Sequence, residues 1–408
     1  MRLTTGTIIA TTFVGQVAGM AGFVSFPALQ PEFQRLWTLS DSEAGFISGI
    51  YFAGYVSAVP LASGLTDRIE ARRVYLTSLL FGVVGALGFA LAAQGLVSAA
   101  LWRFLQGAAF GGAHMPGLRA LSEAVPAKRQ GTAIAVSTAS FTVGSSLSFA
   151  LSGLLASAFG WRLGLALLAL GPLAAAAIGF AILPPTPFRR EPHHARAPLR
   201  SLLQNRRALR FVVAYGLHNS EVSIMRAWMV TLLVTSAAQA GMSSFGAYAT
   251  IVATVANLLG LPLIVLTNEI ATRRHREAVI AIVMTLSGLL GLTLALAAPL
   301  SPVATIGAAI LFGGVATADS GTINTGLFAA TDPGRRGAFL AIHAVSGFGA
   351  AAVAPVLFGL LLDVAGGNHR ALAWIIAFAS QAAINMLWPL SYLLKRWRPA
   401  KSATLEGG

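Results

Sequence analysis

The chain contains no cysteine and little charge. Of its 408 residues, 10% are Asp, Glu, Lys or Arg, whereas a soluble globular domain carries roughly 25%. The missing thiols exclude disulfides, thiolate catalysis and cysteine metal sites. The scarcity of charge leaves too little polar surface to face water on all sides, which excludes a soluble protein. The apolar segments therefore decide the fold class.

Long apolar segments recur along almost the entire chain, and 56% of the residues are hydrophobic. A helix that crosses about 30 Å of hydrocarbon needs roughly 20 such residues. Twelve segments meet this requirement: 6–30, 43–65, 74–94, 98–120, 131–157, 162–183, 209–235, 243–267, 277–299, 303–329, 337–363 and 371–394. We expect an all-α polytopic membrane protein with twelve transmembrane helices.

The twelve spans fall into two sets of six, separated by a long polar stretch. Residues 65–73 after the second span align with 266–274 after the eighth, at a shift of 201 positions with five identities in nine. Repeated six-helix halves with a substrate site between them are a known transporter plan. The expected organisation is an N-terminal six-helix bundle at 1–184, a basic cytoplasmic linker at 185–207, a C-terminal six-helix bundle at 208–394 and a cytoplasmic tail at 395–408.

The positive charges indicate the orientation in the membrane. Of 28 Lys and Arg residues, only Arg35, Arg162 and Arg370 fall in loops of one parity, and Arg103 and Arg226 lie within spans. Because cytoplasmic loops are enriched in Lys and Arg, both termini and the linker are predicted to be cytoplasmic. The net charge of +14 is thus a topology signal and not a nucleic-acid-binding surface. We expect a multi-pass protein of the bacterial cytoplasmic (inner) membrane.

The loop between the second and third spans carries a specific motif. Residues 63–73 follow the pattern G-x-L-x-D-R-x-G-x-R-R at Asp67, Arg68 and Arg72, with Glu70 at a position where glycine is usual. This loop resembles that of the major facilitator superfamily, and the resemblance covers nearly the whole chain. It implies a fold of two six-helix bundles with pseudo-two-fold symmetry. It also implies a cytoplasmic gate at Asp67, Arg68 and Arg72 that holds the bundles together in the outward-facing state.

The fourth span contains a second match, to the R-x-x-Q-G motif of this superfamily, at Arg103 and Gln106. The resemblance implies that the arginine takes part in proton coupling or substrate binding. Arg103, Gln106, Phe110 and His114 are spaced i, i+3, i+7 and i+11, so they form a narrow stripe predicted to line the cavity. The alternative is that Arg103 extends to the outer membrane interface.

Two acidic residues are predicted to lie deep in the membrane. Twelve of the 14 acids fall in loops, tails or span ends, and the exceptions are Glu221 and Asp319. Intramembrane acids are costly and mark functional sites by default, and a carboxyl in a low-dielectric cavity can take up a proton near neutral pH. Glu221 and Asp319 are therefore the candidate proton-coupling residues. The alternative is that each is paired with an arginine or histidine for packing alone.

Polar residues in the spans are the candidate substrate ligands. The cations Arg103 and Arg226 favour an anionic or zwitterionic solute. His218 is three residues before Glu221, so both can share one helix face. The predicted substrate-binding residues are Arg103, Gln106, His114, His218, Arg226 and Asn324.

The sequence predicts a secondary transporter that moves a small organic solute by alternating access, coupled to protons. The alternatives are an efflux antiporter for drugs or lipophilic cations and a non-transporting membrane sensor or scaffold. The antiporter signature of the fifth span is degraded, with Ser148, Phe149 and Ser152 at three of its positions. No G-x-x-x-x-G-K-[ST] loop occurs, which argues against an ATP-driven pump. We expect no enzyme activity, cofactor, metal or nucleic acid, and a monomer whose partners are the solute, protons and the lipid bilayer.

Overall fold

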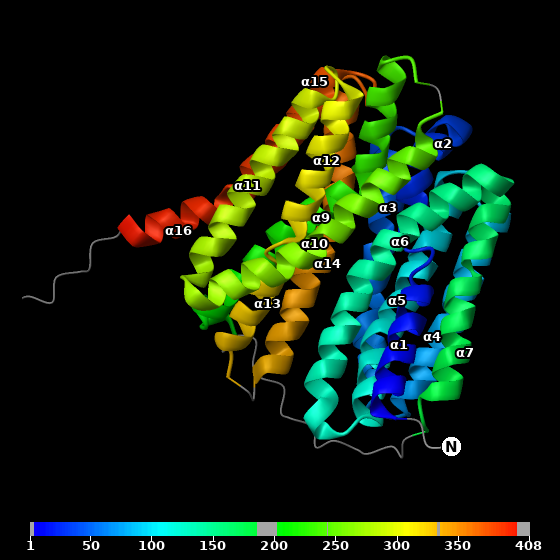
Figure 1. Ribbon diagram of the computed structural model, residues 1–408, viewed down its shortest axis with the longest axis vertical. Coiled ribbons are helices and arrows are strands. Elements are labelled where there is room, and N and C mark those ends of the chain that lie inside the picture. The colour runs from blue at the N-terminus through cyan, green and yellow to red at the C-terminus, as the bar shows by residue number, and fades with distance from the viewer. Residues whose placement is uncertain (1–3, 186–201, 243, 333–334, 398–408) are drawn as a thin grey trace, which may run out of the picture.

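A computed structural model describes residues 4–185, 202–242, 244–332 and 335–397, and these residues contain helices and no strand. Most of the expected linker and tail, at 186–201 and 398–408, lies outside the described residues. The helices form twelve spans in two six-helix bundles, as predicted (Figure 1). We call helices α1 to α7 the N half and helices α9 to α16 the C half.

The N half contains one broken span and one bent helical run. The first span is divided at residues 20–24, and Gly160, with φ of 75°, bends α6 where the fifth span passes into the sixth. The helices are α1 (Thr5–Gly19), α2 (Ser25–Trp37), α3 (Asp41–Leu65), α4 (Ala71–Ala92), α5 (Leu96–Ala124), α6 (Ala127–Leu168) and α7 (Leu170–Ile182).

The C half contains a broken tenth span and a twelfth span that changes direction near Met386. The helices are α9 (Arg206–Gln239), α10 (Gly246–Arg273), α11 (Arg276–Ala297), α12 (Pro302–Thr317), α13 (Ser320–Ala329), α14 (Arg336–Val364), α15 (Ala371–Asn385) and α16 (Leu387–Trp397). Nine helical stretches among the described residues are long and apolar enough to cross a membrane by length and composition. The broken first span, the joined α6 and α7 and the polar α5 account for the difference from twelve.

Local sequence signals begin several of these helices. Ser40 accepts a hydrogen bond from the Glu43 N–H while the Glu43 carboxylate accepts one from the Ser40 N–H, which is a capping box at the start of α3. Ser301 caps α12, and Pro302 follows it in the first turn, where its missing N–H has no cost. These caps fix the helix ends from which the buried side chains project.

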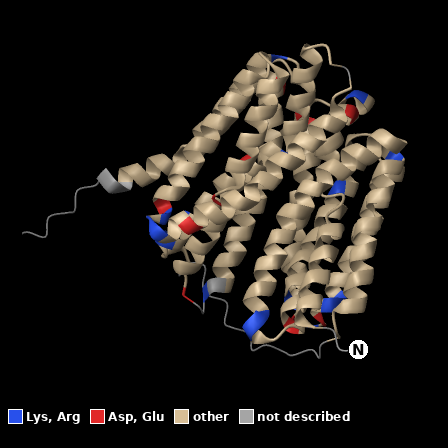
Figure 2. Ribbon diagram, viewed as in Figure 1, with Lys and Arg blue, Asp and Glu red and all other residues tan. Residues whose placement is uncertain are grey.

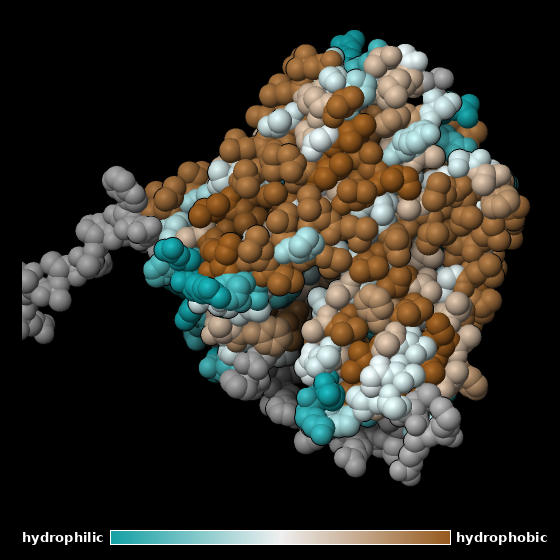
Figure 3. Space-filling model, in the orientation of Figure 1, coloured by the Kyte–Doolittle hydropathy of each residue, from teal (hydrophilic) through white to brown (hydrophobic). Residues whose placement is uncertain are grey.

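The surface separates into an apolar belt and one basic end. Apolar side chains cover the sides of both halves, as a lipid-facing surface requires (Figure 3). Lys and Arg gather at the end that carries the start of α1 and the start of α9, which we call the basic end (Figure 2). Arg35, Arg162 and Arg370 lie at the opposite end. Positive charge is thus concentrated at one end of the structure, in agreement with the uneven distribution of Lys and Arg among the predicted loops.

The halves meet along close helix pairs, of which α3 with α14 and α6 with α10 are the most extensive. Gly45 and Gly49 of α3 face the carbonyl oxygens of Pro355 and Ala352 on α14 so closely that a Cβ at either glycine would overlap them. Small residues permit this backbone approach in membrane helices. The contact therefore fixes how the halves sit against each other on this side.

Candidate functional site

A buried histidine–aspartate pair joins α9 to the break in the tenth span. His218 Nδ1 lies 2.7 Å from Asp319 Oδ1, and the two side chains are 6% and 2% exposed. Asp319 lies between α12 and α13 as the N-cap residue of α13, and its side chain does not cap α13. The break therefore directs the carboxyl toward α9. The structure places the predicted residues His218 and Asp319 in direct contact.

Glu221 lies one turn after His218 and faces the interior of the C half. Its Oε2 accepts a hydrogen bond of 2.9 Å from the Ser287 hydroxyl of α11, and the side chain is 3% exposed. On the neighbouring α15, Gln381 donates to Asn385 Oδ1 at 2.9 Å and to the Ser220 hydroxyl at 3.3 Å. Glu221 thus belongs to a polar layer between α9, α11 and α15, within the C half.

A stack of rings connects the histidine–aspartate pair to the N half. Tyr215 stands 6.1 Å from the His218 ring and 3.7 Å from the His343 ring, measured between centroids. Phe348 of α14 lies 6.4 Å from Tyr215 and 4.2 Å from Tyr55 of α3. The side chains between the buried pair and the junction of the halves are therefore in continuous contact.

Asn324 anchors this stack from α13. Its Oδ1 lies 2.9 Å from His343 Nε2, so the amide holds the imidazole that stacks on Tyr215. Among the described residues, the His343 imidazole is the side-chain hydrogen-bond partner of Asn324. The position supports the ring stack and leaves the predicted role in substrate binding untested.

Arg226 lies between the halves. It projects from α9 and its guanidinium carbon is 5.9 Å from the Phe23 ring and 5.5 Å from the Phe141 ring, both of the N half. Its Nε donates a hydrogen bond of 3.4 Å to Asn257 Oδ1 on α10. Within the described ranges, no carboxylate forms an ion pair with Arg226. Sequence reasoning did not identify Asn257, although an asparagine within an apolar span is a polar signal of the same kind.

Arg103 is held inside the N half. Its Nη2 donates to the Phe23 carbonyl at 3.0 Å, its Nη1 donates to Gln106 Oε1 at 2.8 Å, and the guanidinium carbon lies 4.4 Å from the Tyr51 ring. The side chain is 2% exposed, so it does not extend to the membrane interface. The break between α1 and α2 leaves carbonyls without helical partners, and the arginine supplies the donors that they need.

The rest of the predicted stripe on α5 packs within the same half. Gln106 Nε2 donates to the Gly85 carbonyl at 3.0 Å, which joins α5 to α4. His114 lies 5.5 Å from the Phe110 ring and 6.1 Å from the Phe141 ring. Its imidazole is therefore part of the aromatic cluster that also faces Arg226 through Phe141.

The predicted gate residues Asp67 and Arg72 form contacts within the N half. Asp67 Oδ1 lies 3.3 Å from Arg119 Nη1 at the end of α5, and Arg72 Nη2 donates to the Phe180 carbonyl of α7 at 2.7 Å. Arg68 is exposed beside them. Sequence reasoning missed Arg119, although its spacing of four residues from Glu123 marks a charged helix end.

Most of the hydrogen bonds that join the halves in the described part of the chain lie at the end opposite the basic end. Asp363 at the end of α14 accepts 2.9 Å bonds from the backbone N–H groups of Asp41 and Ser42. Asp41 in turn accepts from the Asn368 side chain at 2.6 Å and from its backbone N–H at 2.9 Å. We call Asp41, Ser42, Asp363 and Asn368 the outer latch. None of these four residues was identified from the sequence.

Comparisons with known proteins agree with this architecture. A sequence model of the Major Facilitator Superfamily matches residues 11–330. No curated protein matches the chain. A mutant of the nucleoside transporter NupG is similar in structure, with a TM-score of 0.74 and 16% identity, over 95% of this chain and 99% of that one. A bacterial homologue of the human lysosomal transporter Spinster, inward-facing and unoccupied, has a TM-score of 0.71 and 16% identity, over 97% and 99%. The family match over most of the chain shows that this protein belongs to the Major Facilitator Superfamily.

Proposed function

We propose that this chain is a secondary transporter that carries a small organic anion or zwitterion across the bacterial cytoplasmic membrane together with protons. The observation that carries the proposal is Arg226, a cation at the junction of the halves with aromatic rings on one side and an amide on the other. A cation in the membrane interior is costly when no opposite charge faces it. A solute carboxylate would supply that charge and two parallel hydrogen bonds.

The same geometry disfavours export of lipophilic cations. Such a solute would need a carboxylate at the junction of the halves, but Glu221 and Asp319 both lie within the C half and are engaged with Ser287 and His218. Arg226 would repel a cationic solute. The aromatic wall of Phe23 and Phe141 fits the apolar body of an organic anion.

Proton coupling is proposed to use Asp319 with His218, and Glu221. A buried acid beside an imidazole can gain or lose a proton with the charge shared between both groups. Tyr215 and Phe348 connect this pair to the N half, so a change in the pair can alter how the halves meet. Solute binding and protonation would thereby be linked through the C half.

We propose that the conformation is inward-facing and that transport is by rocking of the halves. Two observations support this: the outer latch joins the halves at the end opposite the basic end, and the surface is hollowed between the halves toward the basic end (Figure 3). The basic end is proposed to be cytoplasmic. Asp67, Arg68 and Arg72 would close that end in the outward-facing state.

A ligand screen tests the proposed function. Purified protein is heated with organic acids, amino acids, nucleosides and lipophilic cations at two pH values, and unfolding is followed. We expect organic anions or zwitterions to raise the unfolding temperature of the wild type and of Arg35→Gln, an exposed control, but not of Arg226→Gln. Stabilisation by lipophilic cations alone, unaffected by Arg226→Gln, would identify an efflux antiporter instead.

A further inference from the structure

A polar cavity lies at the basic end of the C half, away from the junction of the halves. It has a volume of about 380 Å³ and is bordered by α9, α11, α13 and α16. Its lining includes Arg207, Phe211, His275, Arg276, Glu277 and Tyr392. The proposed transport mechanism uses none of these residues.

The cavity has an excess of positive charge. Its one carboxylate among the lining residues, Glu277, is 3.0 Å from Arg210 Nη2, and the Arg210 guanidinium also lies 4.8 Å from the Trp388 ring. This neighbouring cation offsets the negative charge of Glu277. Arg207 and Arg276 then face the cavity without a carboxylate of their own among its lining residues.

Two further features favour an anion here. The Nε atom of Arg276 is buried without a hydrogen-bond partner in the described part of the chain. The helix α11 also begins at this position, and the His275 side chain does not cap it. The first N–H groups of a helix attract negative charge, which adds to the potential of the two guanidinium groups.

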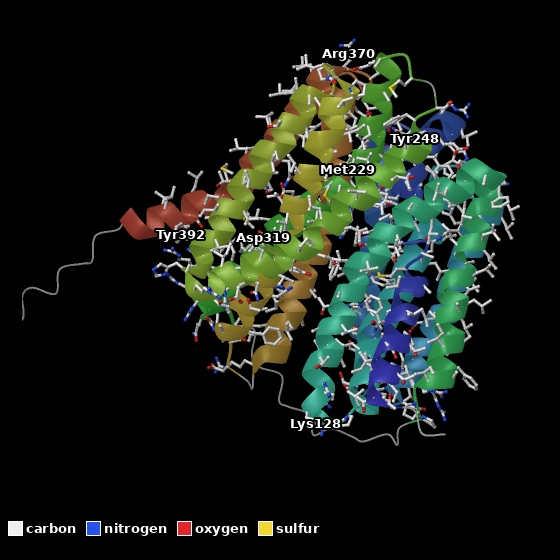
Figure 4. The ribbon with its side chains drawn as sticks, viewed as in Figure 1. Lys128, Met229, Tyr248, Asp319, Arg370 and Tyr392 are labelled. Carbon is white, nitrogen blue, oxygen red and sulfur yellow. The ribbon has the colours of Figure 1, made fainter. Side chains whose placement is uncertain are left out.

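The cavity opens beside a surface suited to lipid chains. The helix α16 leaves the bundle at this level (Figure 1). Its Tyr392, labelled in Figure 4, is one of the residues that line the cavity. Its leucines Leu387, Leu390 and Leu394 are 57%, 53% and 68% exposed. An amphipathic helix at a membrane interface buries such a face among acyl chains. A ligand in the cavity would thus have its charged group against arginines and an apolar part along α16.

We propose that this cavity binds the phosphate group of an anionic phospholipid from the membrane leaflet at the basic end. Two guanidinium groups match the paired oxygens of a phosphate diester. The Tyr392 hydroxyl adds a neutral donor beside them. The excess of positive charge selects phosphatidylglycerol over zwitterionic phospholipids.

Lipid binding to the purified full-length chain tests the proposal. Native mass spectrometry measures retention of phosphatidylglycerol and of phosphatidylcholine by the wild type, by Arg207→Gln/Arg276→Gln and by the control Lys128→Gln/Arg129→Gln. The control removes two exposed cations of the N half. We expect the cavity variant to bind phosphatidylglycerol about thirtyfold more weakly, since each basic residue near an anionic surface contributes roughly a fivefold gain. The control and phosphatidylcholine binding should be unchanged.

Three outcomes would overturn the proposal. These are equal phosphatidylglycerol binding by wild type and cavity variant, an equal loss in the control, and displacement of the lipid by millimolar inorganic phosphate, which would indicate a site for a soluble anion. If the double variant does not fold, Arg207→Gln alone, at an exposed position, should still show about a fivefold loss. Because the experiment measures lipid binding, its result does not depend on whether the proposed solute transport is correct.

Discussion

The two arginines within the spans lie in contrasting surroundings, and these predict different effects of mutation. Arg103 bonds to the Phe23 carbonyl and Gln106, whereas Arg226 has one long hydrogen bond to Asn257. Sequence alone identified both as intramembrane cations. It could not distinguish them, because the carbonyls that Arg103 satisfies appear only where the first span is broken, about 80 residues away in the chain.

Substitution of Arg103 is expected to destabilise the fold. Arg103→Gln leaves the carbonyls at the α1–α2 break without their charged donor, and charged hydrogen bonds contribute about 1.5–3 kcal/mol each. We expect a loss of about 3 kcal/mol, seen as a lower unfolding temperature in detergent. Arg226→Gln, which removes a guanidinium that has fewer partners, should unfold within a few degrees of the wild type. Equal destabilisation by both variants would contradict the assigned difference.

Asp319 is expected to be needed for coupling and not for solute binding. In Asp319→Asn the side chain can still hydrogen-bond to His218 but cannot carry a proton. Exchange of labelled solute across proteoliposomes should persist, while accumulation driven by a pH gradient should fall at least tenfold. Glu221→Gln, measured in parallel, shows whether the second acid shares this role. Full pH-driven accumulation by Asp319→Asn would remove Asp319 from the mechanism.

At the residue scale, the sequence predicted which polar residues are buried and raised an arginine or histidine partner for each acid as an alternative, but it did not identify the partners. Apolar spans make Glu221 and Asp319 conspicuous, so both were found. The contact between His218 and Asp319 joins positions 101 residues apart, and it depends on the break between α12 and α13. Neither the break nor the position of Ser287 opposite Glu221 leaves a periodic signal.

At the scale of helices, hydropathy predicted the twelve spans because each must bury its backbone polar groups in hydrocarbon. It did not predict the breaks at residues 20–24 and at Asp319, because each break lies within a single segment that is long enough to cross the membrane. The first break exposes the backbone carbonyl that Arg103 contacts. The second break positions the Asp319 carboxyl that His218 contacts. The least predictable elements are therefore those that position the candidate site.

The α3–α14 contact yields a test at this scale. A side chain at Gly49 would overlap the Ala352 carbonyl, whereas Gly64 in the same helix has open space around it. We expect Gly49→Val to weaken the packing of α3 on α14 by roughly 1–3 kcal/mol. The unfolding temperature should fall for Gly49→Val and stay near the wild-type value for Gly64→Val. The reverse order would contradict the close packing of α3 on α14.

At the scale of the whole molecule, the outer latch is expected to set the balance between conformations. Asp363→Asn keeps one acceptor but loses the charge that favours the start of α3, which is worth about 1 kcal/mol. This should shift a measurable fraction of molecules toward the outward-facing state. Since the chain has no native cysteine, introduced pairs can be spin-labelled without background.

Two labelled pairs report this shift. Leu36→Cys/Leu372→Cys spans the halves at the opposite end, and Lys128→Cys/Arg274→Cys spans them at the basic end. In Asp363→Asn the first distance should gain a longer component and the second a shorter one. Unchanged distances at both ends would show that the latch does not control the transition.

The most direct test of proton-coupled anion transport uses proteoliposomes with a pH-sensitive dye inside and an anion selected by the ligand screen outside. For the wild type and Arg35→Gln, adding the anion should acidify the interior in the absence of an imposed gradient, because protons enter with the solute. Arg226→Gln should give no acidification. Acidification by Arg226→Gln equal to that of the wild type, or solute entry without proton movement in the wild type, would contradict the account.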